Sequence, residues 1–146
     1  MFYIFVENDE IIGNGQARCL NLQNIEVSEE LYNDYETDKY IYSNGAIVPN
    51  PNYAEIKAQE EQDRINRLTM TALDFINVLK NAGLTIEQIN TYLETHLDLK
   101  MQLICCQNVF CGVAKALCPL EVDNITITSV DVERAFKLKH GEQVAD

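Results

Sequence analysis

The sequence predicts an α+β protein with a small N-terminal antiparallel β module, a linker helix and a C-terminal helical bundle of about four helices. Short β-rich runs separated by turn residues come first, and later apolar residues recur every three or four positions, as on one face of a helix. Of the 146 residues, 47% are hydrophobic, which is enough for a core in a chain of this length. The predicted parts are a β module at 1–52, the polar start of the linker helix at 53–64, the bundle at 65–140 and a frayed tail at 141–146.

Turn residues define the β module. Asn8 and Asp9 are predicted to form a hairpin turn, and Ser28 can cap a short helical turn. Asn44 and Gly45 form an Asn-Gly pair, which readily supplies the positive φ angles of a tight hairpin. Strands are therefore expected at residues 2–6, 10–12, 25–27, 39–42 and 46–48.

Helical periodicity and capping residues define the rest of the chain. Helices are expected at residues 53–81, 86–97, 99–118 and 128–139. Thr85 and Gln88 form a capping-box pattern, and Thr128 with Asp131 can open the last helix. A loop around Asp123 separates the last two helices. The first helix carries an apolar stripe with 3-4-3-4 spacing: Ile65, Leu68, Ala72, Phe75 and Leu79.

That apolar stripe allows two interpretations. It can dock on the third helix of the same chain, or it can form a seam for self-association. Two heptads are too short for a stable isolated coil, so the stripe must pack on something. Docking within the chain is the preferred interpretation. The argument for self-association is that the polar residues 57–64 before the stripe have no evident intramolecular purpose. Ile65, Leu68 and Phe75 are therefore candidate interaction residues.

The charge is strongly negative, with 23 acidic against 11 basic residues and a net charge of −12. Nucleic-acid affinity depends mainly on Lys and Arg, so we expect no direct nucleic-acid binding. The first 38 residues hold nine acids against the single base Arg18. This acidic region either keeps the protein in solution or mimics phosphates in the basic groove of a partner. Paired carboxylates such as Asp9-Glu10 are interpreted as solvated surface.

Four tyrosines lie in or just after this acidic region. Tyr32, Tyr35, Tyr40 and Tyr42 are candidate interface anchors, since tyrosine is enriched at binding hot spots. The alternative is that they face the core of the sheet.

We expect no membrane span, because no apolar run reaches the necessary ~18 residues. The N-terminal run at residues 1–6 has no basic lead-in and predicts a strand rather than a signal peptide. Without export, the five cysteines are expected as thiols. Four of them lack the spacing of metal ligands and are interpreted as core hydrophobes, with a metal site as the alternative: Cys105, Cys106, Cys111 and Cys118.

No catalytic motif includes either of the two histidines, His96 and His140. His96 can complement a helix dipole, and His140 lies near the tail. We therefore assign no catalytic, cofactor-binding or metal-binding residue and expect no enzymatic activity.

Two stretches resemble small tail-fibre-associated and tail-assembly proteins of tailed bacteriophages and prophages. The first is residues 39–55, KYIYSNGAIVPNPNYAE, a hairpin that leads into a helix. The second comprises Leu73-Asp74-Phe75-Ile76, Ala82-Gly83-Leu84-Thr85 and Ile127-Thr128-Ser129-Val130-Asp131, which leads to Phe136. The cysteine cluster departs from the pattern of these proteins.

The resemblance implies a non-enzymatic structural component or assembly chaperone. Its partners would be other phage tail or fibre proteins, with possible self-association, and its location the virion or the host cytoplasm. A second hypothesis is an acidic inhibitor of a host nucleic-acid-binding defence enzyme that acts by charge mimicry. A third is a cysteine-ligated metal protein.

Overall fold

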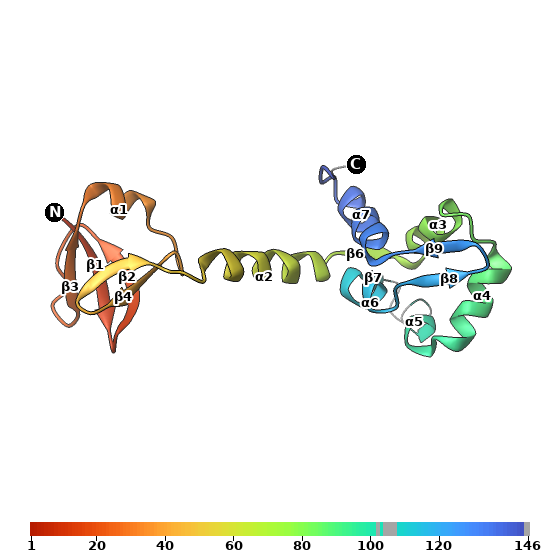
Figure 1. The fold of residues 1–146 in the computed structure, drawn as a ribbon, viewed down its shortest axis with the longest axis horizontal. Helices are drawn as coiled ribbons and strands as arrows, with labels where there is room; N and C mark the ends of the chain where they lie inside the picture. Colours follow the sequence, from red (N-terminus) through yellow and green to blue (C-terminus); the bar gives the residue numbers. More distant parts are fainter. Residues whose placement is uncertain (102, 104–107, 145–146) are drawn as a thin grey trace. The chain divides into compact units, whose positions relative to one another are not determined.

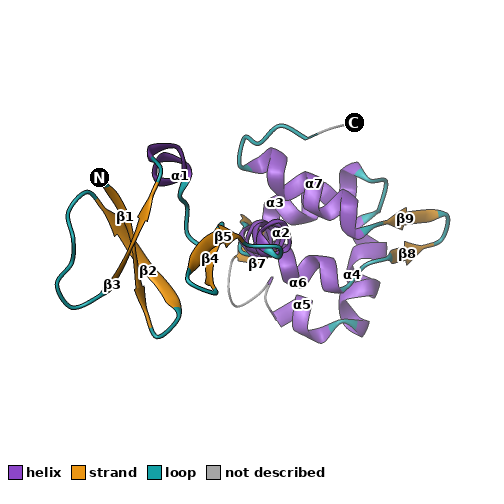
Figure 2. Ribbon diagram, turned by 60° about the vertical axis from the view of Figure 1, so that its left-hand side comes forward, coloured by secondary structure: helices purple, strands orange, loops and turns teal. Residues whose placement is uncertain are grey.

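The computed structural model describes residues 1–101, 103 and 108–144 (Figure 1). It confirms the α+β class. The chain divides into two compact units, Met1–Glu60 and Glu61–Asp146, here called unit 1 and unit 2. The boundary lies inside helix α2 (Tyr53–Asn66). Most of the regular secondary structure is β-strand in unit 1 and α-helix in unit 2 (Figure 2).

A three-stranded antiparallel sheet in the order β2-β1-β3 forms the base of unit 1. Its strands are β1 (Phe2–Glu7), β2 (Glu10–Gly15) and β3 (Gln23–Val27). Asn8 and Asp9 connect β1 to β2 with φ angles of 50° and 65°, as predicted for this hairpin. The buried side chains of this sheet are Tyr3, Ile4 and Val6.

A short helix and a second hairpin complete unit 1. Helix α1 (Glu29–Asp34) begins where the Ser28 hydroxyl accepts a hydrogen bond from the Leu31 amide at 3.2 Å, as predicted. Strands β4 (Tyr40–Ser43) and β5 (Ala46–Pro49) pair through the predicted Asn44-Gly45 turn. Strand β4 lies against β2, and β5 lies against β3.

The predicted continuous helix at residues 53–81 is wrong. Helix α2 ends at Asn66, and strand β6 (Thr69–Thr71) separates it from α3 (Ala72–Asn81). The buried side chain of Met70 lies in β6, which pairs with β7 (Asn108–Phe110). The Thr71 hydroxyl then accepts from the Asp74 amide at 3.1 Å. Threonine suits a strand and a helix N-cap better than a helix interior, which explains the break.

The predicted helix at residues 99–118 is also wrong. The described part of this segment contains α5 (Leu97–Met101), β7 and α6 (Cys111–Ala116). Backbone pairing with β6 explains the difference, because the Cys111 amide also donates to the Leu68 carbonyl at 2.8 Å. Cys105 and Cys106 lie outside the described residues. The expected loop around Asp123 is the turn of a hairpin, β8 (Leu120–Val122) and β9 (Ile125–Ile127).

Two other helices of unit 2 begin at the predicted caps. Capping boxes at Thr85 and Thr128 open α4 (Ile86–Thr95) and α7 (Ser129–Lys139). Instead of a simple bundle, unit 2 has helices interleaved with the β6–β7 and β8–β9 ribbons. Its core is formed by Ile65, Met70, Phe75, Leu79, Leu84, Ile89, Leu93, Leu99, Val109, Cys111, Ala114, Leu120, Ile127, Val132 and Phe136.

None of the helices in the described part of the chain is long and apolar enough to cross a membrane.

Candidate functional site

Three of the four candidate tyrosines line one cavity of unit 1, with a volume of about 400 Å³. Its walls come from the β1–β2 turn with the start of β2, the segment between α1 and β4, and β4 itself. We call this cavity the tyrosine cleft. Its lining residues are Asp9, Glu10, Ile11, Tyr35, Thr37, Asp38, Tyr40, Ile41 and Tyr42.

Two left-handed residues shape the walls of the tyrosine cleft. Asp9 has a φ of 65° in the β1–β2 turn, and Asp38 has a φ of 66° before β4. Aspartate and asparagine adopt this conformation more readily than most residues. The Asn50 side chain donates to the Asp38 carbonyl at 2.7 Å, and the Asn50 amide donates to the Lys39 carbonyl at 2.9 Å. These hydrogen bonds tie the wall that contains Asp38 to the end of the β4–β5 hairpin.

The three tyrosines are half-buried and have different polar surroundings. The Tyr40 hydroxyl donates to the Asp34 carboxylate, and the Gln23 side-chain amide donates to the Tyr42 hydroxyl at 2.8 Å. Burial raises the pKa of Tyr35, and the nearby Asp38 carboxylate raises it further. The tyrosine cleft is thus partly apolar and has a negative charge close to one of its rings.

The basic side chains of unit 1 are engaged away from the rim carboxylates of the tyrosine cleft. Lys39 Nζ lies 2.5 Å from Asp34 Oδ1, and Lys57 Nζ lies 2.6 Å from Glu36 Oε1. Hydrogen bonds from Lys39 and Tyr40 lower the pKa of Asp34. The third cation, the Arg18 guanidinium, lies 5.6 Å from the centroid of a tyrosine ring in β1.

The rim carboxylates form no salt bridge with any described residue. They belong to Asp9, Glu10 and Asp38, and the first two were interpreted from the sequence as ordinary solvated surface. The Asn-Asp turn signal and the acidity of the first 38 residues pointed toward them, but neither signal indicated a shared cavity. The contact between this turn and the segment before β4 joins distant parts of the sequence, and no local pattern indicated it.

The other predicted interaction residues lie elsewhere. The rings of Tyr32 and Phe2 have centroids 4.8 Å apart, which packs α1 against β1. Ile65 and Phe75 are only 3% and 1% exposed in the core of unit 2, and the partly buried Leu68 packs against that core. These three residues of the predicted seam therefore pack within unit 2, although the continuous third helix expected as their partner is not present. Self-association stays a prediction.

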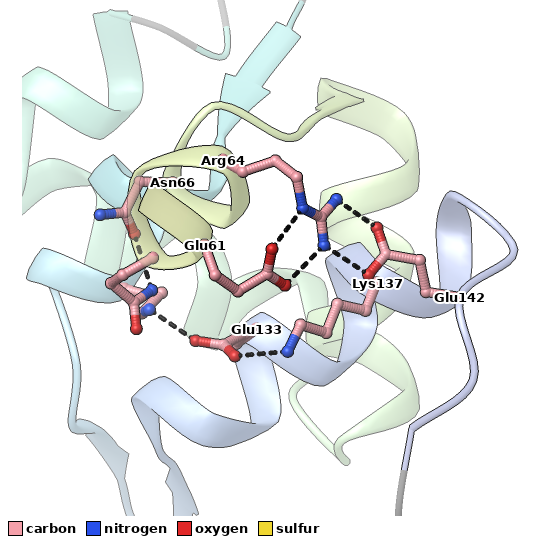
Figure 3. Close-up of polar contacts among 8 residues, drawn as sticks. Glu61, Arg64, Asn66, Glu133, Lys137 and Glu142 are labelled. Carbon is pink, nitrogen blue, oxygen red and sulfur yellow. Dashed lines mark hydrogen bonds and ion pairs between the residues drawn. The ribbon is translucent and has the colours of Figure 1, made fainter. Parts of the chain in front are cut away.

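Unit 2 contains charged groups that neutralise one another (Figure 3). The Arg64 guanidinium bridges Glu61 at 2.7 Å and Glu142 at 2.8 Å, which lowers the pKa of both carboxyls. Lys115 and Lys137 lie 2.6 and 2.9 Å from the Glu133 carboxylate and lower its pKa to about 2. Glu142 is thus anchored, although residues 141–146 were expected to fray. Because opposite charges meet in these contacts, we assign them a structural role.

The cysteines and histidines show no shared arrangement in the described residues. Cys111 is completely buried, which raises its pKa to about 11, and it is a core residue as expected. His96 Nδ1 lies 2.9 Å from the Tyr92 carbonyl near the end of α4, and His140 Nε2 lies 2.8 Å from the Thr69 carbonyl. Among the described residues, no group of three or more His, Cys, Asp or Glu side chains could hold a metal ion.

The tyrosine cleft is therefore the candidate site, with aromatic walls and carboxylates that have no cationic partner in the described chain. It is suited to noncovalent binding of a positively charged group. Comparison with protein-family models, curated proteins and solved structures finds no match for this chain.

Proposed function

We propose that this protein is a non-enzymatic tail-associated protein of a tailed phage or prophage, either a structural component or an assembly chaperone, that acts through protein–protein contacts. The observation that best supports this proposal is the tyrosine cleft. Tyrosine side chains provide large contact areas at low entropic cost and are enriched at interfaces. The unpaired carboxylates at the rim would add charge complementarity to a partner.

Two further observations support the proposal. The β4–β5 hairpin leads into α2 after a short connection, the arrangement in which residues 39–55 resemble tail-fibre-associated proteins. Both histidine rings contact backbone carbonyls, so their arrangement favours a structural role over general acid–base catalysis.

The test is to delete the gene from the phage or prophage that carries it and to examine the particles by electron microscopy. Mass spectrometry of purified wild-type particles then separates the two roles. A structural component is present at constant stoichiometry, whereas a chaperone is absent from particles but needed for complete tails or fibres. Normal, infectious particles after deletion, with the protein absent from wild-type particles, would contradict both roles.

The uneven charge favours a second candidate, inhibition of a host nucleic-acid-binding defence enzyme by charge mimicry. Unit 1 contains eleven acidic residues against three basic ones. Such an inhibitor would compete with nucleic acid for a basic groove, and its affinity would fall steeply with salt. Competition binding at increasing salt concentration distinguishes it from a tail protein that binds mainly through apolar contacts.

A further inference from the structure

The tyrosine cleft combines aromatic rings with unpaired carboxylates, two features that together recognise a guanidinium group. We propose that the cleft receives an arginine side chain of a partner protein. This inference takes one element from the proposed function, namely that unit 1 binds another protein. It adds the chemical group that is recognised and the residues that recognise it.

The aromatic part of the argument rests on Tyr35, Tyr40 and Tyr42. They line the same cavity, and each is partly shielded from water. A cation over an aromatic ring gains more from the contact when water is excluded. Unit 1 already contains two such contacts, because Arg18 and Lys57 each lie 5.6 Å from the centroid of another tyrosine ring.

The electrostatic part rests on Asp9, Glu10 and Asp38, which stand on two walls of the tyrosine cleft. The nearby cations Lys39 and Lys57 already form ion pairs with other carboxylates. The rim carboxylates form no ion pair with these cations. They are therefore available to a positive group that enters the cleft. Arginine suits this site better than lysine, since its planar group can stack on a ring and also donate to more than one carboxylate.

The shape of the site favours an organic cation over a metal ion. Among the described residues, which include the rim carboxylates, no group of three or more His, Cys, Asp or Glu side chains could hold a metal ion. They surround a cavity of about 400 Å³, a size within the usual range of small-ligand sites. A guanidinium has several donors on a flat frame and can reach carboxylates on both walls.

A neighbouring cavity of about 370 Å³ provides a contrast. It shares Tyr40 with the tyrosine cleft and is also lined by Asp34 and Glu30. Asp34 already accepts from Lys39 and from Tyr40, so much of the charge there is neutralised within the chain. The arginine is therefore assigned to the tyrosine cleft and not to this second cavity.

The first experiment titrates the full chain with the peptide Gly-Ser-Arg-Gly-Ser and follows backbone amides by NMR. We expect shifts at Ile11, Thr37 and Ile41, which line the tyrosine cleft. The control peptide contains citrulline, which has nearly the same shape as arginine but no charge. It should bind ~10-fold more weakly or worse, because the charge-assisted hydrogen bonds are lost. Equal binding of the two peptides would overturn the proposal, and so would displacement of the arginine peptide by millimolar CaCl2 at constant ionic strength.

The second experiment compares two double variants with the same change in net charge. Asp9→Asn with Asp38→Asn removes charge from the tyrosine cleft, and asparagine tolerates both left-handed conformations. Glu26→Gln with Glu55→Gln removes charge from exposed positions of unit 1 outside the cleft. We expect ~10-fold weaker binding for the first pair and less than ~2-fold for the second. Equal weakening would mean that only the overall charge attracts the peptide, and the proposal would fail.

A third comparison tests the aromatic contact. Tyr35→Leu should weaken the arginine peptide several-fold, whereas Tyr35→Phe, which keeps the ring, should bind like the wild type. Circular dichroism of each variant checks that unit 1 is folded. Wild-type affinity in folded Tyr35→Leu would contradict the ring contact and overturn the proposal.

The results also separate this inference from the proposed function. If the arginine peptide binds the tyrosine cleft but gene deletion leaves normal tails, the phage function fails and the binding specificity stands. If the protein is needed for tails but the peptide does not bind, the arginine site fails alone.

Discussion

The two units of this protein contain very different cores. In unit 2, fifteen apolar residues that are almost fully buried form one cluster, whereas the described residues of unit 1 include only three at that level of burial. Burial of apolar surface is the main favourable term in folding, and small domains with little of it are marginally stable. Unit 1 therefore depends more on hairpin turns, strand pairing and surface contacts than unit 2 does.

The two units also differ in how their carboxylates are paired. Several acids of unit 2 are paired, as around Arg64 and Glu133, while the rim carboxylates of the tyrosine cleft are not. Unpaired like charges repel one another and lower stability, but they attract a cationic partner. The candidate binding site thus lies in the unit with the smaller buried core.

The largest expected effect is on the core of unit 2. Phe136 is completely buried, and its ring centroid lies 6.2 Å from that of Phe75. Phe136→Ala should destabilise unit 2 by about 3–5 kcal/mol, because transfer free energy is lost and a cavity remains. Hydrogen exchange measured by mass spectrometry should show faster exchange in unit 2 and unchanged exchange in unit 1. Faster exchange throughout the chain would mean that the two units unfold together.

The matching truncation in unit 1 should lower the free energy of unfolding by a smaller amount but disrupt more of the unit's structure. Ile4 is completely buried in the central strand β1. Ile4→Ala should cost about 2–4 kcal/mol, which is enough to unfold a unit with so small a core. Loss of amide protection across β1, β2 and β3 would be the readout. Ile12→Ala on β2, where the side chain is 50% exposed, is the matched control and should have little effect.

Local signals in the sequence predicted several turns and caps correctly. The Asn8-Asp9 and Asn44-Gly45 turns and the capping box at Thr85 depend on residues that are close together in the sequence. Their backbone preferences are therefore readable without tertiary information.

The two long helices could not be predicted correctly by the same means. Met70 pairs with Val109 between β6 and β7, and this ribbon interrupts both predicted helices. Apolar residues spaced every three or four positions occur on both sides of the break, so periodicity alone favoured a continuous helix. The tyrosine cleft was missed in part for a related reason, because Asp9 and Asp38 meet only after unit 1 folds.

An acid titration should destabilise unit 2 through Glu133. Its pKa in the folded chain is about 2, against an ordinary value of 4.5, because of hydrogen bonds from Lys115 and Lys137. The stabilising contribution is fully present above pH 4.5 and is lost as the pH falls toward 2. Allowing for solvent screening, we expect Glu133 to account for about 1–2 kcal/mol of that loss.

Chemical denaturation at several pH values measures this contribution. Glu133→Gln should remove that part of the pH dependence, whereas Glu94→Gln on the exposed side of α4 should preserve it. An unchanged pH profile in Glu133→Gln would show that the two lysines do not stabilise unit 2 through this carboxylate.

A final comparison makes one substitution, glycine to alanine, in both units. Gly45 in unit 1 has a φ of 85°, and a Cβ atom there would have no neighbour within 4 Å. Gly83 in unit 2 has a φ of 104°, and its Cβ would lie 3.1 Å from Ile125 Cδ1. Gly45→Ala should cost about 1 kcal/mol through backbone strain alone, and Gly83→Ala about 2 kcal/mol, because the core must also adjust.

Asparagine variants and a third glycine separate strain from crowding. Gly141 has a φ of 76° and open space around it, so Gly141→Ala should resemble Gly45→Ala although it lies in unit 2. Gly45→Asn should recover most of the loss at that turn, since asparagine tolerates a positive φ, while Gly83→Asn should not. Thermal denaturation of each variant measures these differences. Equal losses for Gly83→Ala and Gly141→Ala would mean that the Ile125 side chain moves aside freely and that the core of unit 2 is less tightly packed at this edge than its burial indicates.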